Sequence, residues 1–206
     1  MLTAPIDNER IINSTFLQED ILLIDFGKSF PYLNPPPDYK PATMPEYMPP
    51  EMHFEGKIGT PADVWGLACT IFQIYAGFPL FNSFFKRDIL KRIVETLGKL
   101  PDPWWGAFKE RHIWFDEDGN PNATGTAEKT SIKQKLAEIG CQGEPPSHHS
   151  RYRLGIIDGP MTEGGTSLND DEIEVLGDLL EKMLQYRPQD RIKMCEVVAH
   201  PWFDQK

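Results

Sequence analysis

The residues with the clearest potential for chemistry are Asp25, Phe26 and Gly27, which directly follow the apolar run 21–24. The length and β-branching of that run predict a buried strand over Ile21–Asp25 that feeds a turn. An aspartate at a rigid strand end offers hard oxygen ligands, and a glycine lets the chain turn sharply. These three residues could therefore hold a cation such as Mg²⁺. They fit an ordinary junction between a strand and a turn equally well.

The element that must organise the rest of the chain is a helix predicted over Thr60–Gly77. Its apolar residues recur at helical spacing, and further apolar residues occupy its other faces. A helix that is apolar almost all round lies in the interior of a domain. We expect Thr60 to cap this helix, Pro61 to occupy its first turn and Gly77 to end it. Its only charge, Asp63, either complements the helix dipole or holds another segment in place.

The remaining pattern predicts a mainly α fold with one short β region near residues 21–25. A proline-rich stretch, 30–50, reads as an extended surface segment. Residues 101–167 form an irregular insert that is rich in glycine, proline, aspartate and tryptophan. Further helices are predicted over about 86–97, 127–139, 169–185 and 193–199. Asn169 and Glu172 have the spacing of a capping box at the start of the third of these.

The composition and net charge indicate what kind of partner and what cellular location to expect. The chain has 206 residues, enough for one sizeable domain, with a net charge of -10 and a pI of about 5.0. This charge argues against nucleic acid or an acidic membrane surface as a partner and favours a basic one. We find no signal peptide and no long apolar run, so we expect no membrane contact and an intracellular location, cytoplasmic or nuclear. The three cysteines show no close pairing, which is typical of a reducing compartment.

The order of the motifs is more informative than any one of them. Asp25-Phe26-Gly27 is followed by Pro49-Pro50-Glu51, by Thr60-Pro-Ala-Asp63-Val-Trp65, and by a C-terminal stretch that contains Arg191 and the segment 200–203, His-Pro-Trp-Phe. This order resembles the second half of a protein kinase domain over about residues 21–203. The variants TPADVWGLAC, ETLGKLP and AHPWF are most similar to the SR-protein kinases of the CMGC group of serine/threonine kinases. Phe26 and Met48 depart from that subfamily, which often has leucine and arginine at these two positions.

The resemblance implies a role for each matching residue. Asp25 would hold the Mg²⁺ that bridges the phosphates of ATP. Asp25, Phe26, Gly27 and Glu51 would anchor the two ends of the activation segment, and Glu51 would form a buried ion pair with Arg191. Asp63 would accept backbone N–H bonds from the catalytic loop. The implied cofactors are ATP and Mg²⁺, and the implied partner is a protein substrate, for which a basic or Arg-Ser-rich sequence fits the acidic charge.

Several parts of a kinase domain have no match in these 206 residues. They are the glycine-rich loop, the lysine and glutamate that accompany it, and the catalytic loop. Asp7 lies at about the right distance before Asp25, but proline and isoleucine replace the expected histidine and arginine, so no catalytic residue is assigned. Asp118, Asp158 and the pair His148-His149 have no counterpart in the resemblance, and we expect the two histidines to be solvated.

The sequence therefore predicts an irregular segment 1–20 and a kinase C-terminal lobe over 21–206. Within the lobe we place the activation segment at about 25–51, the central helix at about 60–77 and the insert at about 101–167. Asp25 is expected at an open face, with Ile21 and Leu23 partly uncovered. We expect phosphoryl transfer to serine or threonine in a complete domain and no activity in this chain alone. The alternative is a binding or scaffolding module, derived from a kinase lobe, that has lost catalysis.

Overall fold

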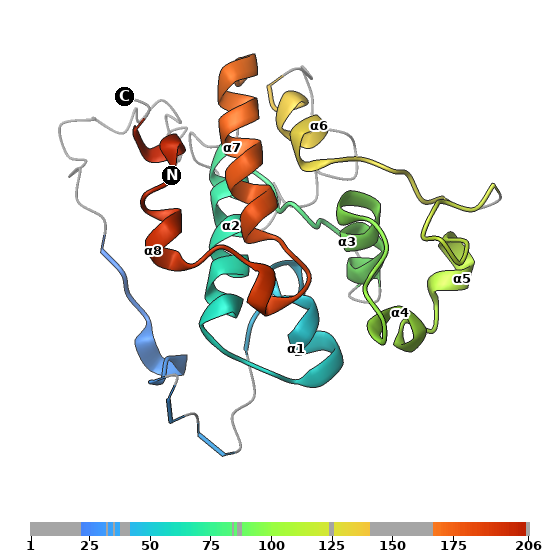
Figure 1. Cartoon of the computed structure of the whole chain (residues 1–206), viewed down its shortest axis with the longest axis horizontal. Coiled ribbons are helices and arrows are strands. Elements are labelled where there is room, and N and C mark those ends of the chain that lie inside the picture. Colours follow the sequence, from blue (N-terminus) through green and yellow to red (C-terminus); the bar gives the residue numbers. More distant parts are fainter. Residues whose placement is uncertain are drawn as a thin grey trace, which may run out of the picture. The chain divides into compact units, whose positions relative to one another are not determined.

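The computed structural model describes residues 22–31, 33–34, 36–37, 42–83, 85, 88–123, 126–140 and 167–204. The chain divides into two compact units, Met1–Pro41 and Ala42–Lys206, and each is considered by itself. The predicted segment 1–20, the residues Asp7 and Ile21, the pair His148-His149 and Asp158 lie outside the described residues. Figure 1 shows the helices in chain order along the colour gradient.

The described residues are mainly helical, as predicted. Their only β-type pairing is one isolated antiparallel bridge between Phe115 and Pro121. The α-helices are α1 (Pro50–Glu55), α2 (Thr60–Ala76), α3 (Ile89–Leu97), α4 (Trp104–Ala107), α5 (Arg111–Trp114), α6 (Ile132–Ala137), α7 (Asp170–Met183) and α8 (Met194–Val197). Short 3-10 turns are η2 (Phe26–Lys28), η3 (Pro45–Tyr47), η7 (Pro188–Asp190) and η8 (Pro201–Asp204). Among these helices, none is long and apolar enough to cross a membrane.

The central helix predicted from the sequence is α2, and it lies in the core. Seven of its residues are buried, among them Trp65 and Phe72, which have no exposed surface. It ends at Gly77, which adopts a left-handed conformation with φ 76° that suits glycine. The expectation that Thr60 caps the helix is wrong. Gly59 is the N-cap, and Thr60 already belongs to the first turn together with Pro61.

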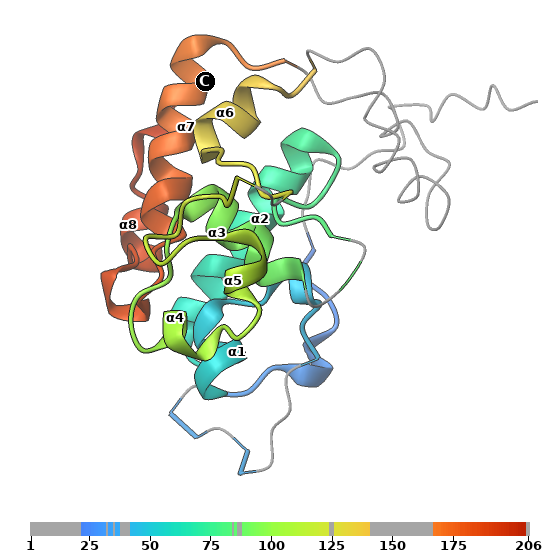
Figure 2. The ribbon, with the colours of Figure 1, turned by 90° about the vertical axis from the view of Figure 1, so that its right-hand side faces the viewer.

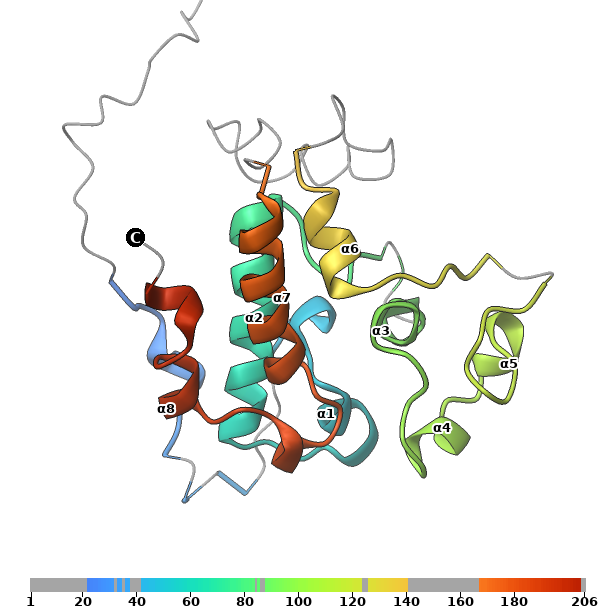
Figure 3. The same ribbon diagram turned by 45° about the horizontal axis from the view of Figure 1, so that its top comes forward.

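Helix α7 runs beside α2, and both views in Figures 1 and 3 show the two helices packed side by side. Leu176, Leu179 and Leu180 of α7 are completely buried in the same core cluster as Trp65 and Phe72. The predicted capping box is present at the start of α7. The Asn169 side chain accepts the Glu172 N–H at 2.9 Å, and Glu172 accepts the Asn169 N–H at 2.8 Å.

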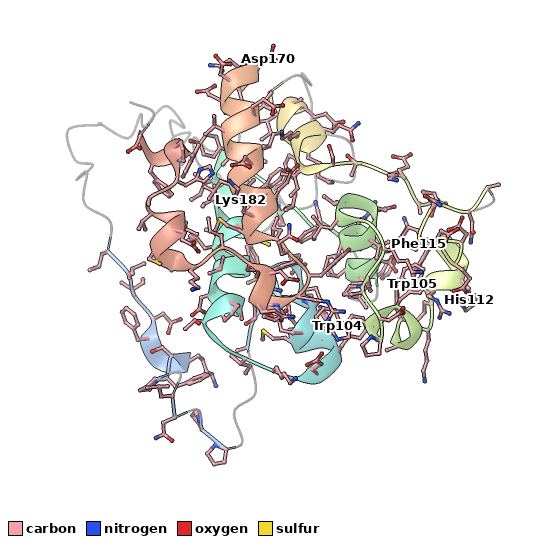
Figure 4. The ribbon with its side chains drawn as sticks, in the orientation of Figure 1. Trp104, Trp105, His112, Phe115, Asp170 and Lys182 are labelled. Atoms are coloured by element: carbon pink, nitrogen blue, oxygen red, sulfur yellow. The ribbon has the colours of Figure 1, made fainter. Side chains whose placement is uncertain are left out.

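The insert contains more structure than its composition indicates. Its first part folds into two single-turn helices, α4 and α5, that close over a second apolar cluster containing Trp104, Trp105, Phe108 and Phe115. Figure 4 shows Trp105 and Phe115 between α3 and α5, with Trp104 on the side of α1. Its second part forms α6, shorter than the predicted 127–139, which packs against α7 (Figure 2).

The predicted strand is not formed over the described residues 22–25. They have no regular secondary structure, because a strand requires a hydrogen-bonded neighbour and the described residues provide none there. Leu22, Leu23 and Ile24 are 74–82% exposed. The sharp turn expected at Gly27 occurs instead at Asp25, whose φ of 64° and ψ of 53° are left-handed.

The contact of α6 with α7 depends on the absence of a side chain at Gly177. A Cβ at this position would lie 2.6 Å from Cγ of Lys133, whose ammonium group is held by Glu174 at 2.5 Å. Moving the stem of Lys133 should cost about 1–3 kcal/mol. Alanine gains about 1 kcal/mol over glycine in a helix interior, so we expect Gly177→Ala to lower the free energy of unfolding by up to about 2 kcal/mol. Urea unfolding of the purified chain measures this.

The matched control is Gly66→Ala on α2, where a Cβ would meet no atom within 4 Å. Since alanine favours a helix interior by about 1 kcal/mol over glycine, this control should raise stability. Equal effects of the two substitutions would contradict the packing of α6 on α7.

Candidate functional site

Asp25 precedes η2 as its N-cap and is exposed. Its carboxylate makes no hydrogen bond within the described part of the chain, and no group of three or more potential metal ligands occurs among the described residues. A single free carboxylate fits the protein share of a Mg²⁺ site, because Mg²⁺ on a nucleotide takes one or two carboxylates and completes its shell with phosphate and water. Asp25 thus suits one ligand position, and the expected open face around it stays a prediction.

Glu51 and Arg191 meet in the interior of the larger unit, although 140 residues separate them. Nη1 of Arg191 donates to Oε1 of Glu51 at 2.7 Å, and Nη2 donates to Oε2 at 2.6 Å. The side chains are only 4% and 1% exposed, respectively. This two-pronged geometry is the strongest form of an arginine–carboxylate contact. It fastens α1, whose first two residues are the last of the expected activation segment, to the chain between α7 and α8.

Arg191 also organises the backbone around it. Its guanidinium donates to the carbonyl oxygens of Gln185 at 2.7 Å, Pro61 at 2.9 Å and Tyr186 at 3.1 Å. The guanidinium carbon lies 4.9 Å from the ring centre of Trp65, a cation–π contact. One side chain therefore joins α1, the first turn of α2 and the end of α7, and every polar contact compensates for the removal of its charge from water.

Asp63 lies on the first turn of α2 and points away from the core, since it is exposed. Its carboxylate makes no hydrogen bond or ion pair within the described residues. Desolvation by partial burial raises its pKa. The catalytic loop that would donate to it has no match in this sequence, so the supporting role of Asp63 stays a prediction. Asp118 is exposed in a turn, where its N–H donates to Asp116 at 3.0 Å.

A contact between α1 and the insert was not anticipated from the sequence. Nε1 of Trp104 donates to Oε1 of Glu55 at 2.8 Å, and the Trp104 ring stacks on Phe54 with ring centres 5.7 Å apart. A separate contact joins the chain after α7 to the end of α3, because the Tyr186 hydroxyl donates to the Gly98 carbonyl at 2.5 Å. Burial raises the pKa of Tyr186. The spacing of Phe54 and Glu55 on a short helix carries no signal of this contact, which depends on tertiary packing.

The two cysteines within the described residues should differ in reactivity. Cys69 is buried on α2, and burial raises the pKa of its thiol, whereas Cys195 is exposed on α8. Since the thiolate is the reactive form, iodoacetamide at pH 8 should alkylate Cys195 in the native chain and reach Cys69 only after unfolding. Peptide mass mapping separates these sites from Cys141. Equal rates at Cys69 and Cys195 under native conditions would contradict the burial of α2.

The chain is similar in sequence to protein kinases over most of its length. The family model described as "Protein kinase domain" matches residues 11–203. Human dual specificity protein kinase CLK1 is 28% identical over 190 residues, which cover 92% of this chain and 34% of the relative. The serine/threonine-protein kinase Doa of Drosophila melanogaster is 27% identical over 186 residues, covering 90% and 20%. Human dual specificity protein kinase CLK2 is 26% identical over 161 residues, covering 76% and 27%. The chain spans about a fifth to a third of the length of these relatives.

Proposed function

Because this chain belongs to the protein kinase family, we propose that it contributes the C-terminal lobe to a domain that transfers phosphate from ATP to serine or threonine. The observation that carries this proposal is the buried pair of Glu51 and Arg191. It joins the end of the expected activation segment to the C-terminal helices, in a fold that is mainly helical. The motifs that contain Glu51, Trp65 and Arg191 are thus in direct contact within the larger unit.

In this proposal each residue has a defined task. Asp25 supplies one carboxylate ligand for Mg²⁺, and the bound metal neutralises charge on the phosphates of ATP. Phe26 and Gly27 begin the activation segment, and Glu51 fixes its end through Arg191. Asp63 accepts N–H groups from the catalytic loop, and its raised pKa fits a carboxylate that still lacks those donors in the described residues.

The proposed substrate is a protein segment of basic character, such as an Arg-Ser-rich one. The net charge of -10 supports this choice, because an acidic protein attracts basic segments. The proposed location, cytoplasm or nucleus, rests on the free thiols and on the intracellular setting in which such kinases act.

A chimera tests the proposal against a scaffolding role. Residues 22–206 would be joined to the N-terminal lobe and catalytic loop of human CLK1, and phosphate transfer to an Arg-Ser-rich peptide would be measured. We expect transfer that Asp25→Ala abolishes, because metal and phosphate positioning provide most of the catalysis in this reaction. A chimera that melts cooperatively, binds the peptide and transfers no phosphate would favour a scaffold.

A further inference from the structure

Helix α1 is held at its two ends by two different parts of the larger unit. In its first turn, Glu51 pairs with Arg191 between α7 and α8. In its last turn, Phe54 packs against the apolar cluster of the insert, and its ring stacks on Trp104 with ring centres 5.7 Å apart. Nε1 of Trp104 also donates to Oε1 of Glu55 at 2.8 Å. The insert therefore contacts the same short helix on which the expected activation segment ends.

The two ends of α1 depend on each other, because the helix has only six residues. A helix this short has too few internal hydrogen bonds to be stable without tertiary contacts. Its C-terminal turn also closes back on the residue that anchors its first turn. The carbonyl oxygen of Glu51 accepts the N–H of Gly56 and, at 3.4 Å, the N–H of Lys57. Loosening of the last turn would therefore free the backbone that carries the Glu51 carboxylate.

Trp104 is itself firmly placed in the insert. It is only 6% exposed and lies on α4, where the next residue, Trp105, packs on Phe115 with ring centres 6.3 Å apart. Its acceptor, Glu55, also receives Nζ of Lys57 at 2.6 Å. Hydrogen bonds from Lys57 and from Trp104 lower the pKa of Glu55. The Glu55 carboxylate is therefore ionised at neutral pH and accepts the indole N–H in a charge-assisted hydrogen bond.

We propose that Trp104 is a positioning residue through which the insert holds α1 and, with it, the end of the expected activation segment. Phe54 and Glu55 receive this contact on α1, and Glu51 lies one turn before them on the same helix. Any change in the insert that displaces Trp104 loosens the end of the segment, so the insert is a place where the kinase lobe can be regulated. The inference rests on the proposed function only for the role given to residues 44–51.

The test measures amide hydrogen exchange by NMR in the full chain, which requires no phosphate transfer. Met48 and Met52 are the probes, because their N–H groups make backbone hydrogen bonds of 3.2 Å and 3.1 Å on either side of the start of α1. Trp104→Phe keeps an aromatic ring against Phe54 but removes the indole N–H. Since a hydrogen bond to a charged group is strong enough to change an equilibrium about tenfold or more, both amides should exchange about tenfold faster or more.

Trp105→Phe is the matched control, because it is the same substitution at a neighbouring buried tryptophan whose indole N–H has no partner within the described residues. It should leave the exchange of Met48 and Met52 as in the parent chain. A second pair of variants changes the acceptor. Glu55→Ala removes it and should speed up both amides, whereas Glu55→Gln keeps an acceptor oxygen for Trp104 and should restore much of the protection. This rescue separates positioning by the hydrogen bond from a general loss of packing.

Two results would overturn the proposal. One is unchanged exchange of Met48 and Met52 in both Trp104→Phe and Glu55→Ala, and the other is equal acceleration by Trp104→Phe and Trp105→Phe. Because the side chain of Glu55 is 32% exposed, Glu55→Ala decides the question even where Trp104→Phe does not fold. The result is independent of the chimera. Faster exchange with an inert chimera contradicts only the proposed function, and unchanged exchange with an active chimera contradicts only this inference.

Discussion

Replacing Glu51 by alanine is expected to lower the free energy of unfolding by about 3–5 kcal/mol, the usual cost of stranding one partner of a buried ion pair. The guanidinium of Arg191 would stay 1% exposed with three carbonyl oxygens but no counter-charge. Because small domains are stable by only about 5–15 kcal/mol, this loss should be visible as a large fall in the urea midpoint. Arg191→Met should have an effect at least as large, because it strands a buried carboxylate.

The control for this prediction is Glu117→Ala. Glu117 pairs with Arg111 at 3.4 Å, but its side chain is 80% exposed. Pairs of this kind contribute about 0–1 kcal/mol, so the urea midpoint should hardly move. Similar midpoints for Glu51→Ala and Glu117→Ala would show that the pair of Glu51 and Arg191 does not hold the larger unit together.

Trp65→Ala is the second substitution with a large expected effect, a loss of about 3–5 kcal/mol. Trp65 has no exposed surface, and its ring stacks on Phe81 with centres 5.6 Å apart while it lies against the guanidinium of Arg191. Removing the indole leaves a cavity. It also removes the ring that covers the guanidinium of Arg191, which is paired with Glu51. Trp65→Phe should cost less, because the indole Nε1 has no partner within the described residues.

Ile74→Ala on the same helix is the control, since Ile74 is 65% exposed and its truncation should change stability by no more than about 0.5 kcal/mol. A double-mutant cycle gives a further check. Because Glu51 and Trp65 both contact Arg191, their truncations should be coupled by about 0.5–3 kcal/mol. Strict additivity of Glu51→Ala and Trp65→Ala would contradict a shared role around Arg191.

Long apolar periodicity and cap chemistry explain why much of the fold was predictable. The stripes of α2 and α7 extend over several turns, and Asn169 with Glu172 fixes the start of α7. Helices α4 and α5 escaped prediction because a single turn has no period to detect, and they depend on tertiary burial of Trp104 and Trp105. The predicted strand is not formed over the described residues 22–25, because local β-propensity cannot supply a partner strand.

The residues of the site likewise include some that the sequence predicted, whereas other buried charges were not predicted. The motif order was sufficient to place Glu51 beside Arg191, because each motif specifies a position in a shared architecture. Outside the candidate site, the buried charges of Lys91 and Glu95 on α3 gave no such signal. Lysines and glutamates at helical spacing are typical of a solvated face, and only the packing of the segment before α6 buries Lys91 and Glu95.

We propose that the residues of this chain form a kinase lobe that does not transfer phosphate by itself. Its 206 residues contain no match to the base that orients the acceptor hydroxyl or to the lysine that fixes the α- and β-phosphates. General acid–base groups alone contribute about 10²–10⁴-fold to such a reaction. We therefore predict that Asp25 can position a metal in this chain without a useful rate of transfer.

The most direct measurement is a radiolabelled γ-phosphate assay on the purified chain with Mg²⁺, ATP and an Arg-Ser-rich peptide. We predict no transfer above that of a sample without the chain. Transfer that Asp25→Ala abolishes would contradict the proposal that this chain is inactive by itself. It would mean that the first twenty residues supply a catalytic loop in unfamiliar form.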